Sequence, residues 1–152
     1  MRKSVKAGIL KQESIEGLRE ILTKYFEDKN EVKAAYLYGS IVSGKNVKDS
    51  DVDIALLTER YKDRIQGDRA RVRYQIEISK LTRKDVDLVF LQEAGELLCF
   101  QILETGQVIF ERDKEMHRSF RAYRLVECLD FQFLENRMQK GMVAAMRRST
   151  VG

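Results

Sequence analysis

The sequence predicts one domain of the α/β (α+β) class, in which a small sheet carries flanking helices and a long C-terminal helix. Short strand-like runs alternate with helical patterns up to about residue 112, and from residue 113 the pattern is wholly helical. The 152 residues are enough for one domain with a sizeable core. We therefore divide the chain into a core, residues 1–112, and a C-terminal helical extension of the same domain, residues 113–152, which is a candidate partner or dimer surface.

Four elements are predicted in the first half of the core. Apolar residues at helical spacing predict a first helix over about residues 13–28, and residues 32–38 form a strand that ends at Gly39. Residues 51–57 alternate in the way a strand does, and a helix is expected over residues 62–81. Its inward face is expected to contain Ile65, Val72 and Ile76, with Ile78 and Leu81 as further candidates.

The second half of the core continues the alternation. Residues 85–91 form a strand rich in β-branched and aromatic residues. A short apolar helix over about residues 94–104 ends at Gly106, because glycine commonly stops a helix. Residues 107–110 form a last short strand.

A single helix over about residues 113–148 is longer than the small sheet needs for cover. Apolar residues recur along it mostly at steps of three or four, which indicates an amphipathic stripe. They are Met116, Phe120, Tyr123, Val126, Leu129, Phe133, Met138, Met142 and Met146. We expect part of this stripe to pack on the core and the rest to be a docking surface for another protein or for a second copy of the chain.

Composition favours a cytoplasmic protein. Cys99 and Cys128 lie in helical patterns without a CxxC motif or a histidine cluster, so we expect reduced, buried thiols rather than a disulfide or a zinc site. No stretch approaches the ~20 apolar residues of a membrane span, so no membrane contact is expected. The formal net charge is +4, but no basic groove with interleaved aromatics is evident, which argues against nucleic acid as a partner.

The pattern that carries chemistry is Gly39-Ser40, ten residues, and then Asp51-Val52-Asp53. Side chains alternate along a strand, so Asp51 and Asp53 share one face with Cα atoms about 6.5–7 Å apart. Two such carboxylates repel each other unless a cation lies between them, and Mg²⁺ is commonly held by carboxylates together with substrate phosphates. Gly39 allows close approach of a phosphate and Ser40 adds a hydroxyl donor. The pattern predicts metal-dependent phosphoryl or nucleotidyl transfer; the alternative is a polar turn before an edge strand with solvated acids.

A third acid belongs to the strand over residues 85–91. Asp87 lies inside this strand and suits a rigid ligand or base, provided the two acidic strands are neighbours. Asp85 shares its face but is expected to be a solvated residue at the strand entry. Lys45 and Lys48 lie in the loop before the first acidic pair and could meet phosphates, although ordinary solvated lysines are the simpler interpretation.

Gly39, Ser40, Asp51, Asp53 and Asp87 together resemble the DNA polymerase β-type nucleotidyltransferase superfamily. More narrowly, they resemble its minimal nucleotidyltransferase (MNT) group, represented by the MntA-type antitoxins of prokaryotes. The resemblance implies a small mixed sheet, and two Mg²⁺ ions bound with a nucleoside triphosphate by the first two aspartates. It also implies that Asp87 completes the metal site and helps to activate the attacking hydroxyl, so that the three aspartates are catalytic. The Gly-Ser pair would contact the triphosphate.

The resemblance covers about residues 12–112 and implies a reaction and a partner. Antitoxins of the MNT group pair with a separate HEPN-type RNase toxin, and active ones transfer AMP from ATP to a tyrosine of that toxin. The chain is too short to contain a HEPN helical bundle beside its core, so such a toxin would act in trans. Two alternatives stay open: a small-molecule nucleotidyltransferase similar to aminoglycoside-modifying enzymes, and a non-catalytic antitoxin that acts by occlusion.

Arg112 and His117 have the Arg-x4-His spacing associated with HEPN ribonucleases. Those enzymes are helical bundles, and the acid after Arg112 differs from the asparagine usual there. We therefore expect His117 to be a surface residue near the start of the last helix.

Overall fold

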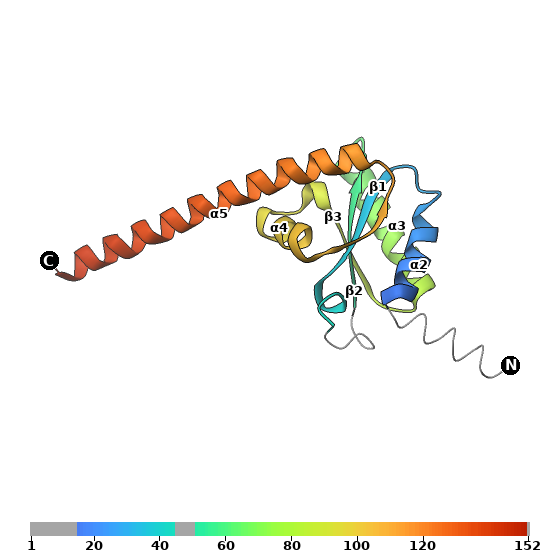
Figure 1. Ribbon diagram of the computed structural model, residues 1–152, viewed down its shortest axis with the longest axis horizontal. Coiled ribbons are helices and arrows are strands. Elements are labelled where there is room, and N and C mark those ends of the chain that lie inside the picture. The colour runs from blue at the N-terminus through green and yellow to red at the C-terminus, as the bar shows by residue number, and fades with distance from the viewer. Residues whose placement is uncertain (1–14, 45–50, 152) are drawn as a thin grey trace.

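A mixed four-stranded sheet lies at the centre of the computed structural model, which describes residues 15–44 and 51–151 (Figure 1). The strand order is β3-β2-β1-β4. The strands are β1 (Val32–Tyr38), β2 (Val52–Thr58), β3 (Val86–Phe90) and β4 (Gln107–Glu111). β1 is antiparallel to both β2 and β4, whereas β2 and β3 are parallel. The predicted α/β class with a small mixed sheet is confirmed.

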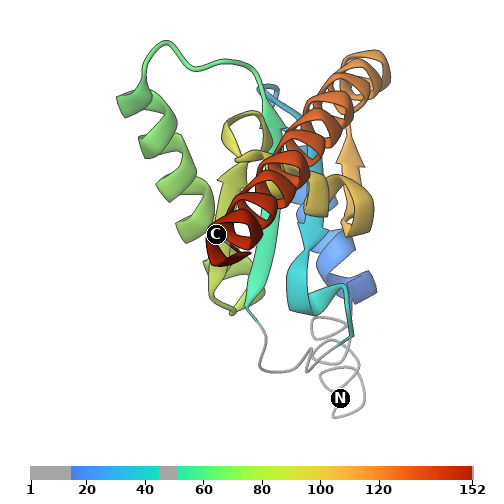
Figure 2. The same ribbon diagram turned by 90° about the vertical axis from the view of Figure 1, so that its left-hand side faces the viewer.

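Helices cover both faces of this sheet (Figures 1 and 2). They are α2 (Ile15–Phe26), α3 (Arg64–Thr82), α4 (Glu96–Thr105) and α5 (Lys114–Val151), with short 3-10 turns η1 (Gly39–Ile41) and η2 (Leu91–Glu93). α2 and α3 pack on one face, while α4 and the first half of α5 pack on the other. Every predicted element is present, and the beginning of the first helix before residue 15 lies outside the described residues. None of the helices in the described ranges is long and apolar enough to cross a membrane.

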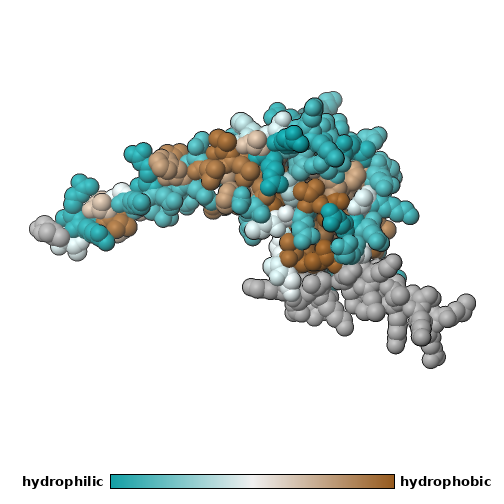
Figure 3. All heavy atoms as spheres, in the orientation of Figure 1, coloured by the Kyte–Doolittle hydropathy of each residue, from teal (hydrophilic) through white to brown (hydrophobic). Residues whose placement is uncertain are grey.

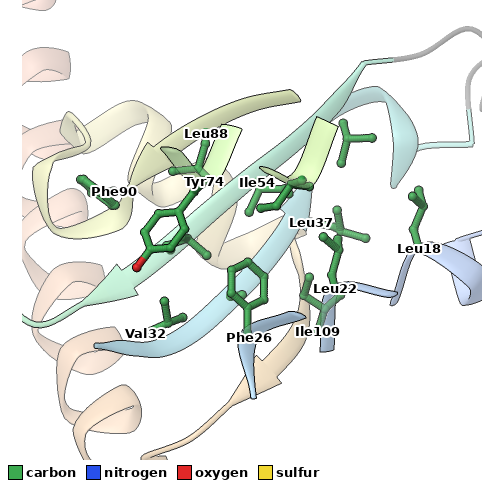
Figure 4. Close-up of a cluster of buried hydrophobic side chains, with 14 of the residues drawn as sticks. Leu18, Leu22, Phe26, Val32, Leu37, Ile54, Tyr74, Leu88, Phe90 and Ile109 are labelled. Atoms are coloured by element: carbon green, nitrogen blue, oxygen red, sulfur yellow. The ribbon is translucent and has the colours of Figure 1, made fainter. Parts of the chain in front are cut away.

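Alternation along the strands divides the core into two clusters. Ile54 of β2 and Leu88 of β3 face α2 and α3, where they pack with Phe26 (Figure 4). Cys99 and Cys128 belong to the cluster on the other face. Both are free, buried thiols, as predicted.

The inward face predicted for α3 is wrong. Ile65, Val72, Ile76 and Leu81 are 64, 48, 51 and 46% exposed, and only Ile78 of the predicted set is buried. The buried residues are instead Gly67, Ala70, Tyr74, Ile78 and Thr82, which recur at steps of three and four. Small residues let α3 approach the sheet, and the polar tips of the larger ones find partners: the Tyr74 hydroxyl donates to Glu31, and the Thr82 hydroxyl donates to the Ile78 carbonyl at 2.9 Å.

A small part of the α5 stripe packs on the core. Phe120 packs against the buried cluster, but most of the remaining stripe residues are more than half exposed. Of the α5 residues whose burial is described, only His117 and Cys128 are buried, because only the first half of the helix lies over α4 and the sheet (Figure 1).

Gly106 stops α4 for a steric reason. Its φ of −70° is accessible to any residue. A Cβ at this position would, however, lie 2.4 Å from the Ile102 carbonyl oxygen and 3.3 Å from that of Leu37. The glycine therefore allows the chain to turn tightly from α4 into β4 beside β1.

Candidate active site

The two acidic strands lie side by side within the sheet. β2 pairs with β3 in parallel register, which places Asp53 directly opposite Asp87. On its other side β2 pairs with β1, and there Asp53 lies opposite Tyr38. Because β2 has a neighbour on both sides, the alternative of an edge strand with solvated acids is wrong for this strand. Asp53 is partly buried, whereas Asp87 is exposed.

The Gly39-Ser40 turn meets the Asp53 carboxylate. Gly39 follows the last residue of β1 and has a φ of +77°, in the left-handed region that favours glycine. A Cβ on Gly39 would lie 2.3 Å from Asp53 Oδ2. The backbone N–H groups of Val42 and Ser43 both donate to the Gly39 carbonyl at 3.2 Å, which folds the turn back over its start. Ser40 is exposed next to this contact.

The surroundings of Asp53 make its carboxyl harder to ionise. Burial raises the pKa of the Asp53 carboxyl, and the charges of Asp87 and Asp51 raise it further. Tyr38, which the motif analysis did not single out, is only 7% exposed. Burial and the charges of Asp53 and Asp87 raise the pKa of Tyr38 to about 12, so its hydroxyl is neutral at physiological pH. The signal for Tyr38 was its place immediately before Gly39, on a strand that leads into the site.

Two further predicted residues, Asp51 and Asp85, lie where the acidic strands begin. Asp51 is exposed immediately before β2. Asp85 is exposed immediately before β3, where its carbonyl accepts a 2.8 Å hydrogen bond from the backbone N–H of Val52, so its expected place at the strand entry is confirmed. Lys45 and Lys48 lie outside the described residues.

A divalent cation suits this set of ligands. Asp51, Asp53 and Asp87 offer the hard carboxylate oxygens that Mg²⁺ prefers. The repulsion that raises the pKa of Asp53 is the effect that a bound cation would relieve. Over residues 15–44 and 51–151, no three His, Cys, Asp or Glu side chains stand close enough together to hold a metal ion. The metal role of the three aspartates therefore stays a prediction.

His117 is not the surface residue that we expected. It is 4% exposed, lies one turn into α5, and faces the sheet. The Tyr36 hydroxyl pairs with its Nε2 and the Glu111 carboxylate with its Nδ1. Burial follows from these two partners, since they satisfy both ring nitrogens.

Arg112, the other half of the Arg-x4-His spacing, is a structural residue. Its guanidinium donates to the carbonyl oxygens of Phe26, Glu27 and Val32 at 2.9, 2.8 and 3.2 Å. It therefore ties the end of α2 to the start of β1.

Comparison with known proteins agrees with this geometry. The family model described as Polymerase beta, Nucleotidyltransferase matches residues 20–115. Over 83 residues the chain is 34% identical to the protein adenylyltransferase MntA of Shewanella oneidensis. The match covers 53% of this chain and 57% of that protein, so the chain spans little more than half the length of this curated relative.

Solved structures of toxin–antitoxin complexes contain similar chains. A crystal structure of the toxin-antitoxin with AMP-PNP gives a TM-score of 0.63 at 25% identity, over 84% of this chain and 98% of that one. A structure of tri-AMPylated Shewanella oneidensis HEPN toxin in complex with MNT antitoxin gives a TM-score of 0.60 at 24% identity, over 85% and 96% of the two chains. The second likeness is one of fold alone.

Proposed function

The chain belongs to the polymerase beta nucleotidyltransferase family, and from this premise we propose that it is an antitoxin that transfers AMP from ATP to a tyrosine hydroxyl of a HEPN-type RNase toxin acting in trans. The adenylyltransferase name of the relative from Shewanella oneidensis supports the reaction. The AMP-PNP complex of a similar toxin–antitoxin pair supports an adenine nucleotide as the donor.

The main observation behind the proposal is that three residues of the sequence motif, Gly39, Asp53 and Asp87, lie on adjacent strands and turns of the sheet. Gly39 lies against the Asp53 carboxylate, and Asp53 lies opposite Asp87 on the neighbouring strand. A glycine turn in contact with one carboxylate, on a strand whose neighbour carries a second, supports a phosphate site close to acidic residues. A purely structural turn would not require the left-handed glycine to approach an acid that is partly buried.

The residues of the chain have distinct tasks in the transfer. Asp51, Asp53 and Asp87 would hold two Mg²⁺ ions, which, when bound, stabilise the attacking and leaving oxygens of an in-line displacement. Gly39 and the exposed Ser40 would contact the triphosphate, the first through its backbone and the second through its hydroxyl.

The proposed transfer exchanges one oxygen bond of the α-phosphorus of ATP for another. The tyrosine oxygen of the acceptor forms a bond to the α-phosphorus of ATP, and the bond from that phosphorus to the bridging oxygen of the β-phosphate breaks. Pyrophosphate leaves with the electron pair of the broken bond. Asp87, exposed beside Asp53, accepts the proton of the acceptor hydroxyl. Tyr38 is the nearest tyrosine to the carboxylates along β1, but it is only 7% exposed as a residue and belongs to the core, so we do not assign it as the acceptor.

A transfer assay tests the proposal. The purified chain is incubated with ATP, Mg²⁺ and the HEPN-type protein encoded beside it, and products are measured by intact-mass spectrometry. We expect an AMP-sized mass increase on a tyrosine of the toxin that is lost with EDTA and in the Asp51→Asn/Asp53→Asn variant. A stable complex without any mass change would instead establish an antitoxin that acts by occlusion.

A further inference from the structure

The second half of α5 projects away from the domain. From residue 129 onward the helix passes beyond α4 and the sheet, and hydrophobic patches are visible along its exposed surface (Figures 1 and 3). Large apolar side chains there are strongly exposed: Phe131 41%, Leu134 58%, Met138 69%, Met142 60% and Met146 63%. We call residues 129–151 the projecting half. Most of the stability of a helix in a protein comes from packing of its apolar face, so an apolar contact would stabilise the projecting half.

These apolar residues form one stripe that continues the docked face of α5. Buried Cys128 is followed at steps of three and four by Phe131, Leu134, Met138 and Met142. Phe133, which is 61% exposed, lies about 140° around the helix from Met138 and outside the stripe. The face of α5 that packs on the sheet in the first half of the helix therefore continues into the projecting half, where no described residue packs against it.

Charge is divided along the same helix. Residues 125–136 contain three acids and no base, whereas residues 137–148 contain four bases and no acid. The acids are Glu127, Asp130 and Glu135, and the bases are Arg137, Lys140, Arg147 and Arg148. Glu127 pairs with Arg124 of its own turn, but no salt bridge within the described residues uses any of the others. A helix with this division is complementary to a reversed copy of itself, and a parallel copy would place like charges together.

We propose that the projecting half pairs antiparallel with the projecting half of a second copy, with Met138 at the two-fold axis. In this register Leu134 faces Met142 of the second copy, and Phe131 faces its Ala145, so the stripe is covered from both sides. Asp130 and Arg148 are 18 residues apart, which is five full turns, and therefore lie on one line of the helix beside the stripe. The pairing places Asp130 of each copy close to Arg148 of the other. It does not depend on the proposed transfer reaction.

The first test is the mass of the full chain in solution, by sedimentation equilibrium over a range of concentrations. We expect a dimer whose dissociation constant rises on the order of tenfold or more in Met138→Glu, because each dimer would bury two charges at its centre. Phe133→Glu is the matched control, since it adds the same charge outside the stripe, and it should leave the dimer unchanged. Circular dichroism confirms that both variants are folded. A monomeric wild-type chain, or equal effects of the two substitutions, would overturn the proposal.

The second test fixes the direction of pairing. Asp130→Arg and Arg148→Asp should each weaken the dimer, and the variant with both changes should restore it, because the exchanged charges again meet across the axis. Arg147→Asp is the control, as Arg147 lies about 100° from Arg148 and away from the stripe. Parallel pairing, or docking of a different protein on this face, predicts no restoration in the doubly substituted chain, and that result would refute the antiparallel dimer.

Discussion

Gly39→Ala tests the candidate site, because the distance between the added Cβ and the Asp53 carboxylate is known from the structure. Gly39 has a φ of +77°, and an L side chain in this region costs about 1–2 kcal/mol. The new Cβ would lie 2.3 Å from Asp53 Oδ2, whereas contacts under 3.0 Å essentially never occur, so the carboxylate oxygen must move by at least 0.7 Å. The atom that moves is the end of a side chain, so we expect the displacement to reduce activity more than stability.

Gly44→Ala provides the control. Gly44 has nearly the same φ, +76°, but a Cβ there meets nothing within 4 Å. Both variants should lose about 1–2 kcal/mol in the free energy of unfolding, measured by urea denaturation. In the AMP-transfer assay only Gly39→Ala should be slowed, by on the order of 100-fold, because misplacing a reacting group by about 1 Å can cost that much. Equal transfer rates in the two variants would refute the role assigned to the contact between Gly39 and Asp53.

Three further predictions follow from the described contacts. Burial and the charges of Asp87 and Asp51 raise the pKa of the Asp53 carboxyl, so the folded state binds its proton more tightly than the unfolded chain does. The free energy of unfolding therefore falls as pH rises between the unfolded and folded pKa values of Asp53. In metal-free urea denaturation at pH 7, Asp53→Asn should be more stable than wild type, and a less stable variant would contradict this. His117→Leu should lower the free energy of unfolding by about 1–3 kcal/mol, because the Tyr36 hydroxyl and the Glu111 carboxylate both lose the buried ring that pairs with them, and a double-mutant cycle with Tyr36→Phe should show that the two losses are not additive. Arg112→Met should cost about 2 kcal/mol by thermal or urea unfolding, yet leave the AMP-transfer rate of the folded protein unchanged.

The strands could be predicted because their signal is local. β1 was predicted with the bounds it has, and in β2 the residues that alternate with the acids, Val52, Ile54 and Leu56, lie in the core. The same period of two places Asp53 on the opposite face. That Asp53 lies opposite Asp87 required only that the two acidic strands be neighbours in parallel register, which the structure provides.

The helix faces could not be predicted in the same way. On α3 every branched apolar residue except Ile78 is exposed, while Gly67, Ala70 and Tyr74 are buried, because close packing on the sheet selects small residues and a tyrosine whose hydroxyl has a partner. His117 is buried for a similar reason, because its ring pairs with Tyr36 of β1 and Glu111 of β4. Both partners belong to other elements than α5, so the pattern along the helix does not indicate them. Hydropathy alone contains no information about such tertiary partners.

The edge position of β3 makes the site easier to unfold than the sheet. β3 has five residues and, among the strands of the described residues, pairs only with β2, whereas Asp53 lies on a strand that pairs on both sides. Opening of β3 alone removes Asp87 from Asp53 and leaves the pairing of β1 with β2 in place. Local opening of this kind needs less free energy than global unfolding. Catalytic competence should therefore be lost on heating before the sheet melts, and amide hydrogens of β3 should exchange faster than those of β2.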